Sequence, residues 1–291
     1  MNYNFVLRFQ IIVQLKLIIM NRFKHLMLAA TLFCVVAVIM SSCSKDDDKK
    51  DEDNKLAEKI IGKWMVADLD GQPAPTNLKA VVTFISPTKA LGSISDVYGS
   101  SWNNQSETDV RIEGNTVTVE YEDGGAKQTL IMDVKSITDT DMQLSSRWTK
   151  KDPDGTETEE CYTERWIRVN TDYRQAIIGT WEGHITSEQS KYDDGEDHRW
   201  EYRADGTYVY YDKVEQDGET TWVTHDNSVS NYIADGTLLC TRWTDRNDGK
   251  TELREWWEIE SIKDGVMKWT ALRMNDDGTT YTATFQMSKV K

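Results

Sequence analysis

The chain has 291 residues, a net charge of −15, 29% charged residues, four prolines and four cysteines. Residues 1–42 contain four basic residues and no acidic one, so the remainder holds 30 basic against 49 acidic residues, a net charge of −19. Nucleic-acid binding needs Lys and Arg side chains that neutralise phosphates, and this acidity excludes nucleic acid as an expected partner. It also argues against adhesion to an anionic membrane surface and favours solubility.

The chain begins with a segment that has the order of an export signal. A basic stretch at 22–25 precedes an apolar run over 26–40, and two serines follow. This order, with an apolar run of about 7–15 residues, is typical of secretory signal peptides, whereas a transmembrane anchor needs about 20 apolar residues. The sequence therefore predicts a signal peptide over 1–42, with Met20 as the suspected true start.

The signal ends in Met-Ser-Ser-Cys, residues 40–43. These four residues resemble the lipobox of bacterial lipoproteins, with Met40 where leucine is usual. The resemblance implies a diacylglycerol on the Cys43 thiol, cleavage before Cys43 and a lipid anchor in the cell outer membrane, because two or more acyl chains anchor a protein stably. An ordinary secretory cleavage near a buried cysteine is the alternative.

A charged segment follows Cys43. In SKDDDKKDEDNK, residues 44–55, ten of twelve residues are charged and none is apolar. Such a composition cannot bury enough surface to offset its ordering entropy, so 43–55 is predicted to be a disordered, acidic tether. A serine, a lysine and acids after a lipobox also resemble the surface-export signal of lipoproteins from Bacteroidetes-type bacteria, which implies surface exposure. A solvated spacer without that role is the alternative.

The remainder of the chain contains an internal repeat. Its spacing of about 120 residues is the size of a whole domain and exceeds the 20–50 residues of solenoid or propeller repeats. The sequence therefore predicts two domains, 56–170 and 174–291. The matching segments are KIIGKWMV at 59–66 with AIIGTWEG at 176–183, VRIEGNTVTV at 110–119 with NYIADGTLLC at 231–240, and SITDTDMQL at 136–144 with SIKDGVMKW at 261–269.

Each repeat is predicted to consist of β-strands separated by turns rich in Gly, Asp and Asn, residues that accept the positive φ of tight hairpins. Residues 281, 283, 285 and 287 alternate with polar neighbours, as a half-buried strand requires. Only 73–80 is expected to hold a helical turn. The eight strands predicted in the second repeat are about 178–186, 198–204, 207–213, 220–234, 237–244, 251–262, 266–274 and 279–289.

Eight antiparallel strands are expected to close into a barrel, because closure removes exposed edges. Each repeat opens with Gly-x-Trp, at 62–64 and 179–181. This motif resembles the opening signature of lipocalins and related calycin barrels, here most like the lipocalin-like lipoproteins of gut Bacteroidetes. The resemblance implies an all-β chain of two tandem, up-and-down, eight-stranded barrels. It also implies a basic residue stacked on a tryptophan at each barrel base, Arg168 on Trp64 and Lys289 on Trp181. A β-sandwich is the alternative.

The sequence contains no motif that indicates an enzyme. The histidines at 184, 198 and 225 are not paired at i, i+4, and no glycine-rich phosphate loop or nucleophile elbow is present. Acidic loops at 191–200 and 245–252 lack the spacing of a calcium loop and are interpreted as solvated turns. We therefore expect no catalytic residue, no metal and no cofactor.

Cysteines and aromatic residues complete the interpretation. Cys161 and Cys240 are about 80 residues apart, which is no disulfide framework. We expect two buried free thiols, with a bridge as the alternative, since export permits disulfides. Adjacent Trp256 and Trp257 must point to opposite faces of one strand, so one of them is expected outside the barrel or at a domain contact.

The second repeat is the richer in aromatic residues, whose faces suit apolar ligands and sugar rings. We therefore predict a non-enzymatic module whose second barrel holds a small apolar or sugar-like ligand, with the first barrel as a spacer. A lipoprotein with filled barrels that docks another envelope protein is the alternative. The first barrel is expected to be lined by Val81, Val117, Val119 and Leu144. The candidate ligand residues are Trp200, Tyr202, Trp257, Trp269, Tyr281 and Phe285.

Overall fold

A computed structural model describes residues 56–93, 107–123, 125–186, 197–224, 230–245, 248–275 and 277–290. The predicted signal peptide, Cys43 and the acidic tether lie outside these ranges. All of the described residues except 277–279 belong to one compact unit. Within these ranges no helix combines the length and the hydropathy that crossing a membrane requires.

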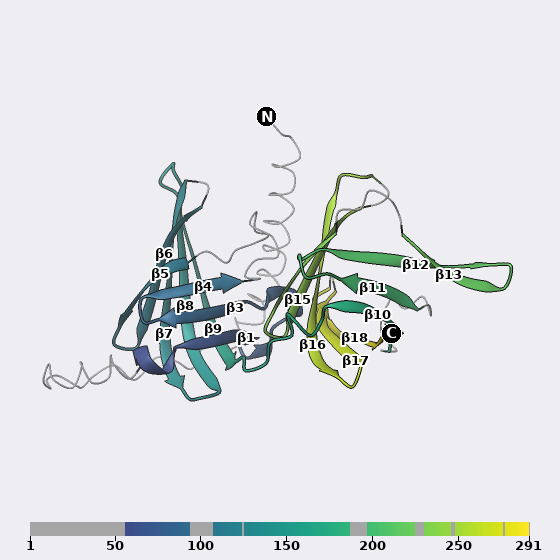
Figure 1. Cartoon of the computed structure of the whole chain (residues 1–291). Coiled ribbons are helices and arrows are strands. Elements are labelled where there is room, and N and C mark those ends of the chain that lie inside the picture. The colour runs from purple at the N-terminus through teal and green to yellow at the C-terminus, as the bar shows by residue number, and fades with distance from the viewer. Residues whose placement is uncertain are drawn as a thin grey trace, which may run out of the picture. The chain divides into compact units, whose positions relative to one another are not determined.

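The first repeat folds into a closed antiparallel barrel of eight strands (Figure 1). Strands β3 to β9 pair in chain order, and β1 pairs with both β3 and β9, which closes the ring. The two-residue strand β2 adds a short ladder to β1. The strands are β1 (Gly62–Leu69), β2 (Gln72–Pro73), β3 (Val81–Ser86), β4 (Lys89–Ser93), β5 (Glu107–Glu113), β6 (Thr116–Asp123), β7 (Ala126–Ile137), β8 (Asp141–Lys151) and β9 (Glu157–Arg168).

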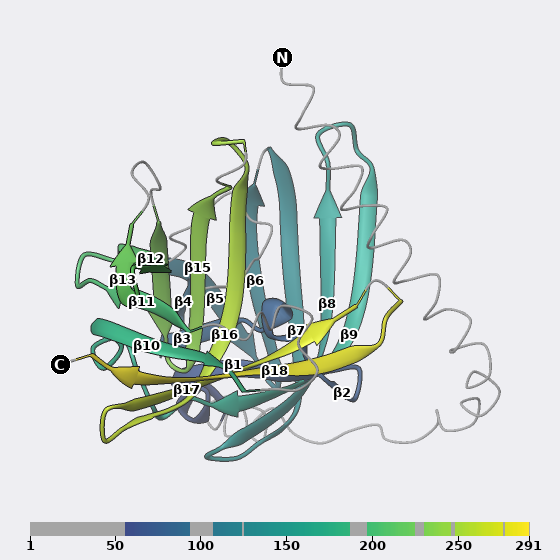
Figure 2. The same cartoon turned by 90° about the vertical axis from the view of Figure 1, so that its right-hand side faces the viewer.

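The second repeat forms a nine-stranded antiparallel sheet in which β10 pairs with β18 (Figure 2). Its ring of eight strands is completed by one bridge, Thr207 to Asn231, between the start of β12 and that of β14. Strand β13 pairs only with β12, as a hairpin. The strands are β10 (Gly179–Ile185), β11 (His198–Tyr202), β12 (Tyr208–Gln216), β13 (Glu219–Val223), β14 (Asn231–Asp235), β15 (Leu238–Thr244), β16 (Glu252–Lys263), β17 (Val266–Met274) and β18 (Thr280–Lys289).

Two details of the predicted strands are wrong. The predicted strand 220–234 is two strands, β13 and β14, which lie in different parts of the sheet. The repeat alignment at 110–119 is also shifted by one residue, because Gly114 and Gly236 take the same turn position, with φ of 60° and 61°. Because side chains alternate along a strand, a shift of one residue exchanges the two faces of the sheet.

Among the described residues the helical content is small and lies in the first repeat. Residues 56–59 form one helical turn, and the Ile60 amide donates to the Leu56 carbonyl at 2.9 Å. The 3₁₀ turn η1 (Thr76–Leu78) is the single turn predicted within 73–80. Leu56 and Ile60 are buried in the core of the first barrel, so this turn covers apolar side chains of the barrel interior.

The two barrel interiors have different compositions. The first is mainly aliphatic, and the second is mainly aromatic. Of the predicted lining residues of the first barrel, Val117, Val119 and Leu144 belong to its core, but Val81 does not. Val81 pairs with Met65 across β1 and β3, and both side chains point away from the barrel interior.

A third apolar cluster joins the two repeats. Met65 and Val81 pack there with Leu238, Cys240 and Trp256 of the second repeat. Lys79 and Glu258 form an ion pair of 2.5 Å, and Lys63 pairs with Asp235. Trp256 therefore lies at a contact between the repeats while Trp257 lies inside the second barrel, as their adjacency on one strand predicts.

Both cysteines of the described region are free thiols. Cys240 is buried, and burial raises its pKa, so it is an unreactive core residue. Cys161 is exposed, so the expectation of a second buried thiol is wrong. It lies on the outward register of β9, one residue from the inward positions 160 and 162.

Candidate ligand-binding interior

The repeated Gly-x-Trp motif builds the same arrangement in both barrels. The indole Nε1 of Trp64 donates to the Ile60 carbonyl at 2.7 Å, and that of Trp181 donates to the Ile177 carbonyl at 2.7 Å. The Arg168 guanidinium carbon lies 4.2 Å from a Trp64 ring centroid, and the Lys289 Nζ lies 5.2 Å from that of Trp181. The structure thus places a cation over each indole face.

The glycine of the motif makes room for this cation. Gly62 has a φ of +125°, and a Cβ there would lie 2.3 Å from Nη1 of Arg168. Gly179 has a φ of +134°, and a Cβ there would lie 2.7 Å from Cε of Lys289. Glycine is therefore required both by the backbone conformation and by the basic side chain that crosses it.

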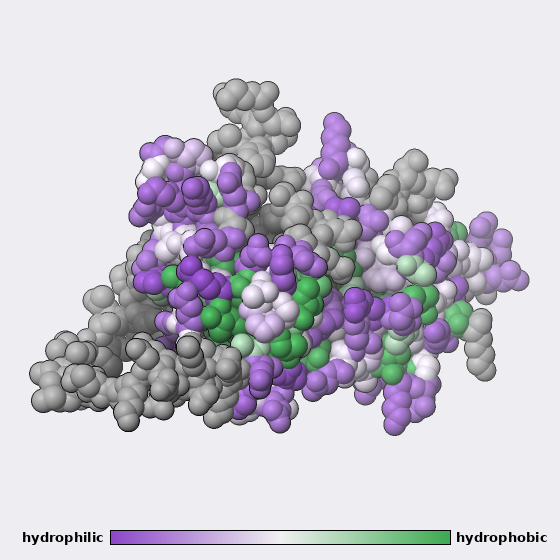
Figure 3. All heavy atoms as spheres, turned by 60° about the vertical axis from the view of Figure 1, so that its left-hand side comes forward, coloured by the Kyte–Doolittle hydropathy of each residue, from purple (hydrophilic) through white to green (hydrophobic). Residues whose placement is uncertain are grey.

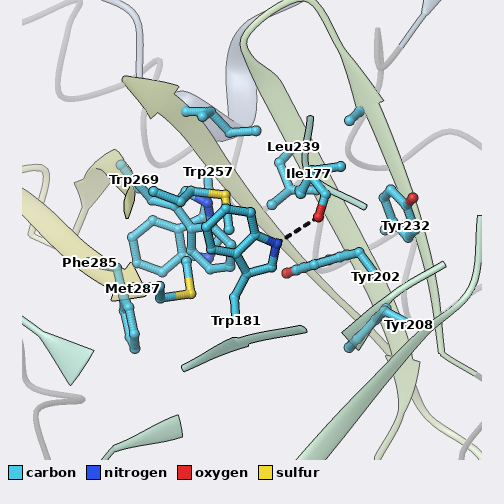
Figure 4. Close-up of a cluster of buried hydrophobic side chains, with 14 of the residues drawn as sticks. Ile177, Trp181, Tyr202, Tyr208, Tyr232, Leu239, Trp257, Trp269, Phe285 and Met287 are labelled. Atoms are coloured by element: carbon cyan, nitrogen blue, oxygen red, sulfur yellow. Dashed lines mark hydrogen bonds between the residues drawn. The ribbon is translucent and has the colours of Figure 1, made fainter. Parts of the chain in front are cut away.

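All six predicted ligand residues lie in or against one aromatic cluster of the second barrel. Figure 4 shows its four buried members, Tyr202, Trp257, Trp269 and Phe285. Tyr202, Trp257, Trp269 and Phe285 are buried, whereas Trp200 and Tyr281 are partly exposed. Trp269 lies at its centre, with ring centroids 5.5 Å from Trp257, 5.6 Å from Trp200 and 5.8 Å from Phe285. Tilted and edge-on contacts at these separations are favourable for aromatic pairs.

Strands β17 and β18 show how this interior changes along the barrel. Their register places Met267 opposite Met287, Trp269 opposite Phe285, and Ala271 opposite Ala283. The next inward pair is Arg273 with Tyr281, and the Arg273 guanidinium lies 4.7 Å from a Trp257 ring centroid. Large rings are thus followed by two alanines and then by a charged residue.

Two polar atoms inside the cluster have no hydrogen-bond partner among the residues that the structure describes. They are the Tyr202 hydroxyl and the Trp269 indole nitrogen, whose residues are only 1% and 2% exposed. Burial raises the pKa of Tyr202 well above its usual value, and nearby charges including Glu255 add to the shift, so the hydroxyl stays protonated. Buried polar groups are almost always satisfied, and leaving one unpaired costs about 1–3 kcal/mol.

The sequence interpretation missed two members of the partly exposed side of the cluster, His198 and Tyr210. Nδ1 of His198 and the Tyr210 hydroxyl are 2.7 Å apart. Their rings lie 5.6 Å and 5.5 Å from that of Trp200. The alternation of 198, 200 and 202 along β11 would have identified His198, since these residues share a face.

The acidic loops form no cation-binding site within the described part of the chain. No group of three His, Cys, Asp or Glu side chains there has the arrangement of metal ligands. Residues 191–196 lie outside the described ranges, and Asp197 contacts His184 at 3.3 Å and Lys213 at 3.6 Å. Hydrogen bonds from Thr251 and Lys250 lower the pKa of Asp248 to about 2, as expected of a carboxylate that stabilises a turn.

Comparisons with known proteins place the chain near no family. No family model matches it, and no curated protein matches it. A protein of unknown function from the DUF3598 family of Nostoc punctiforme is 8% identical, with 81% of this chain and 98% of that chain covered and a TM-score of 0.22. Transferrin Binding Protein B from Haemophilus parasuis, a double mutant, is 8% identical, with 80% and 45% covered and a TM-score of 0.22. These likenesses are too distant to carry a functional argument, and the interpretation rests on the residues of the barrels themselves.

Proposed function

We propose that the chain is a non-enzymatic lipoprotein that binds a small, neutral ligand in the second barrel. The observation that carries this proposal is the pair of buried, unpaired donors, Tyr202 and Trp269. An oxygen atom of a ligand would supply the acceptor that both donors lack, while the faces of Trp200 and Phe285 contact an apolar body or a sugar ring. Small-molecule sites commonly combine such an apolar lining with a few converging polar groups.

The charges around the donors favour an uncharged ligand. Both donors are neutral, and burial, with smaller contributions from Tyr208 and Glu255, raises the pKa of Tyr202. Burial and the nearby Glu255 carboxylate both disfavour a negative charge at this hydroxyl. Arg273 lies near the cluster, but its Nη2 is already 3.1 Å from Glu255. Burying an unpaired carboxylate here would cost several kcal/mol. A carbonyl, ether or hydroxyl oxygen therefore fits better than a carboxylate.

Tyr202→Phe tests this proposal in the chain that begins at Ser44. Removing the hydroxyl should weaken the binding of a fatty alcohol or an oligosaccharide about 5–10-fold, since one hydrogen bond is worth about 1 kcal/mol. The melting temperature should stay the same or rise, because the variant loses an unsatisfied group. Tryptophan fluorescence titration measures the affinity.

Tyr211→Phe is the matched control for this substitution. The Tyr211 hydroxyl donates to Glu201 at 2.6 Å, and Tyr211 occupies the register opposite to that of the inward Tyr210. This variant should leave ligand affinity unchanged. No fluorescence response to any ligand of the panel, or equal affinity in wild type and Tyr202→Phe, would contradict the proposal.

The proposal also includes a lipid anchor at Cys43 in the outer membrane, facing the cell surface. The order of basic, apolar and small residues before Cys43 supports it. A tether of twelve residues would hold the barrels on the order of 20 Å from the membrane. Cys43→Ala should move the protein from the membrane fraction to the soluble fraction. Sedimentation of the variant with outer membranes would contradict the anchor.

Docking of another envelope protein is a second candidate function, and the β12–β13 hairpin favours it. Figure 1 shows this hairpin extending beyond the rest of its sheet. Val214 and Val223 on it are 38% and 39% exposed, and β13 has a neighbour on one side only among the described strands. Such an edge can accept a partner strand.

The hairpin can be tested apart from the barrel interior. Replacing Val214 and Val223 together by Asp should abolish capture of an envelope protein and leave ligand binding intact. Figure 3 shows that hydrophobic atoms also gather in one area of another face, bordered by hydrophilic ones. Unchanged capture in the double variant would exclude the hairpin as the docking element and leave this hydrophobic area as the other candidate.

A further inference from the structure

The inner face of the first barrel changes character along β8 and β9. Met142 and Trp166, which are opposite each other, are buried in the core. The next inward pairs are Leu144 with Glu164, Ser146 with Tyr162, and Trp148 with Glu160. Because side chains alternate across a sheet, these residues share the face of Trp166. Two carboxylates thus occupy inward positions of β9.

The second barrel has no carboxylate at the equivalent positions. The register of β17 and β18 places Phe285 where the first barrel has Glu164, and Tyr281 where it has Glu160. The two acids do not belong to the solvent-exposed outer face of β9, because Cys161 and Thr163, which alternate with them, form that face. The acids of the first barrel are therefore a specific feature of its interior.

Both carboxylates are held by aromatic donors. The Trp166 indole Nε1 donates to Oε2 of Glu164 at 2.6 Å, and the Tyr162 hydroxyl donates to Glu160. Neither carboxylate has a Lys or Arg partner among the described residues. Burial, the hydrogen bond to Glu160 and the charges of Glu160, Asp70 and Glu164 raise the pKa of Tyr162. Lys150 lies at the next inward position of β8, and its Nζ is 2.7 Å from Oδ1 of Asp152. This end of the interior therefore holds two carboxylates that have no cationic partner in direct contact within the described part of the chain.

Ser146 provides an independent sign of a missing partner. It is 3% exposed, its hydroxyl has no hydrogen-bond partner, and it lies directly opposite Tyr162 on the inward face. In contrast, Glu160 and Glu164 are partly exposed and Tyr162 is exposed although all three lie on the inward register, so solvent reaches this end of the interior. A buried hydroxyl without a partner next to two accessible carboxylates indicates a ligand with hydrogen-bond donors.

The wall next to β8 in the same barrel is aliphatic. Val117, Val119 and Leu130 of β6 and β7 pack in or against the core, together with Ile112 of β5. The ladder between β7 and β8 places Leu130 opposite Trp148. An aliphatic wall thus adjoins a wall of acids and aromatic rings.

We infer that the first barrel binds an amphiphilic organic cation, such as an alkylammonium ion. Its ammonium group would donate to Glu160 and the Ser146 hydroxyl beside the ring of Tyr162, and its alkyl body would contact the aliphatic side chains of β6 and β7. Glu164, about 13 Å further along β9, would add a second negative charge to the site. Aromatic faces attract ammonium groups, whereas calcium would need about six to eight oxygen ligands. This site is separate from the one proposed in the second barrel and gives the first barrel a function beyond that of a spacer.

Calorimetric titration of the chain from Ser44 with three twelve-carbon probes tests the inference. Dodecylammonium should bind with one equivalent and at least tenfold more tightly than dodecanoate at pH 7. Any dodecanol binding should belong to the second barrel and be weakened by Tyr202→Phe. Glu160→Gln with Glu164→Gln should weaken dodecylammonium binding at least tenfold. Glu159→Gln is the matched control, because it removes an exposed charge from the outward face of the same strand.

Two further variants keep the inference falsifiable if the double variant does not fold. Ser146→Ala should weaken dodecylammonium binding about threefold and leave the melting temperature unchanged or higher. Tyr202→Phe should not affect it. Equal affinity for dodecanol and dodecylammonium in the Tyr202→Phe variant, or full dodecylammonium binding in the folded Glu160→Gln, Glu164→Gln variant, would overturn the inference. Loss of dodecylammonium binding in Tyr202→Phe would also overturn it, by placing the cation in the second barrel.

Discussion

The two barrels share their opening motif and differ in what lines them beyond it. Trp64 and Trp181 make the same 2.7 Å hydrogen bond to a carbonyl four residues earlier, and each lies under a basic residue. Beyond this level, Leu144 and Glu164 face each other in the first barrel, whereas Trp269 and Phe285 do so in the second. The layer around the tryptophan is common to both repeats, and the layers beyond it give the two interiors different chemistry.

The barrels also differ at the seam that closes the ring. In the first, β4 and β5 pair over three residue pairs from Lys89 to Leu91. In the second, the equivalent strands meet only at the bridge from Thr207 to Asn231, and β13 is added as a hairpin. The second barrel therefore has fewer backbone hydrogen bonds at this seam, on the side where His198, Trp200 and Tyr210 are partly exposed.

The largest expected effect comes from removing the shared tryptophan. Trp64→Ala and Trp181→Ala should each lower the free energy of unfolding by about 3–5 kcal/mol, because each deletes a fully buried ring and leaves a cavity. Urea denaturation followed by circular dichroism measures the loss. Trp222→Ala, on the partly exposed β13 hairpin, is the control and should cost much less. A small effect at only one of the two sites would break the equivalence of the barrels.

Gly183→Ala should separate the barrels more sharply. A Cβ at Gly183 would lie 1.9 Å from the Gln286 carbonyl oxygen and 2.6 Å from the Met287 Cα, so β10 and β18 would have to move apart. The first barrel has Val66 at the equivalent position, next to a bulge in the β1–β9 ladder. We expect a loss of about 1–3 kcal/mol, typical of overpacking, by urea denaturation. Ser288→Ala, exposed on β18, should be neutral, and neutrality of Gly183→Ala would show that the strands yield without cost.

Sequence patterns predicted the features that depend on local chemistry. The all-strand character and the hairpin turns follow from glycine and alternation, and the stacked pairs Arg168–Trp64 and Lys289–Trp181 lie where the Gly-x-Trp resemblance implies. The patterns failed where tertiary register decides. Val81 alternates like a lining residue but faces the second repeat, because β1 and β3 present their outer faces to it. Glu160 and Glu164 were not recognised, because a charged strand resembles a solvated one until its register is known.

A smaller effect distinguishes the two basic residues. Arg168 donates to the carbonyls of Asp139, Ile61 and Lys59 at 2.6, 2.7 and 2.6 Å, whereas Lys289 donates only to Ile178, at 3.1 Å. Arg168→Lys should therefore cost about 1–2 kcal/mol, since at least one carbonyl bond of about 1 kcal/mol is lost while the charge remains. Lys289→Arg should be neutral or stabilising. Thermal denaturation of both variants measures the asymmetry, and equal losses would contradict it.

The smallest effect is a change in stability at low pH. It depends on Glu201, a carboxylate that the second barrel has and the first barrel lacks. Glu201 on β11 accepts hydrogen bonds from Arg203 at 2.8 Å and from the Tyr211 hydroxyl at 2.6 Å, and these bonds lower its pKa below the ordinary 4.5. A carboxyl group whose pKa is lowered by folding contributes stability above its ordinary pKa, and this contribution is lost as the pH falls through the folded value.

The first barrel has Thr83 at the equivalent position. Thr83 lies opposite Lys63, just as Glu201 lies opposite Thr180 in the second barrel. Glu201→Gln should therefore reduce stability at pH 7 by less than about 1 kcal/mol, since the pair is partly exposed. The difference from wild type should shrink as the pH falls from 5 towards 3, which urea denaturation over this pH range would measure. A difference that stays constant over this range would mean that Glu201 stabilises the second barrel through packing, and not through its charge.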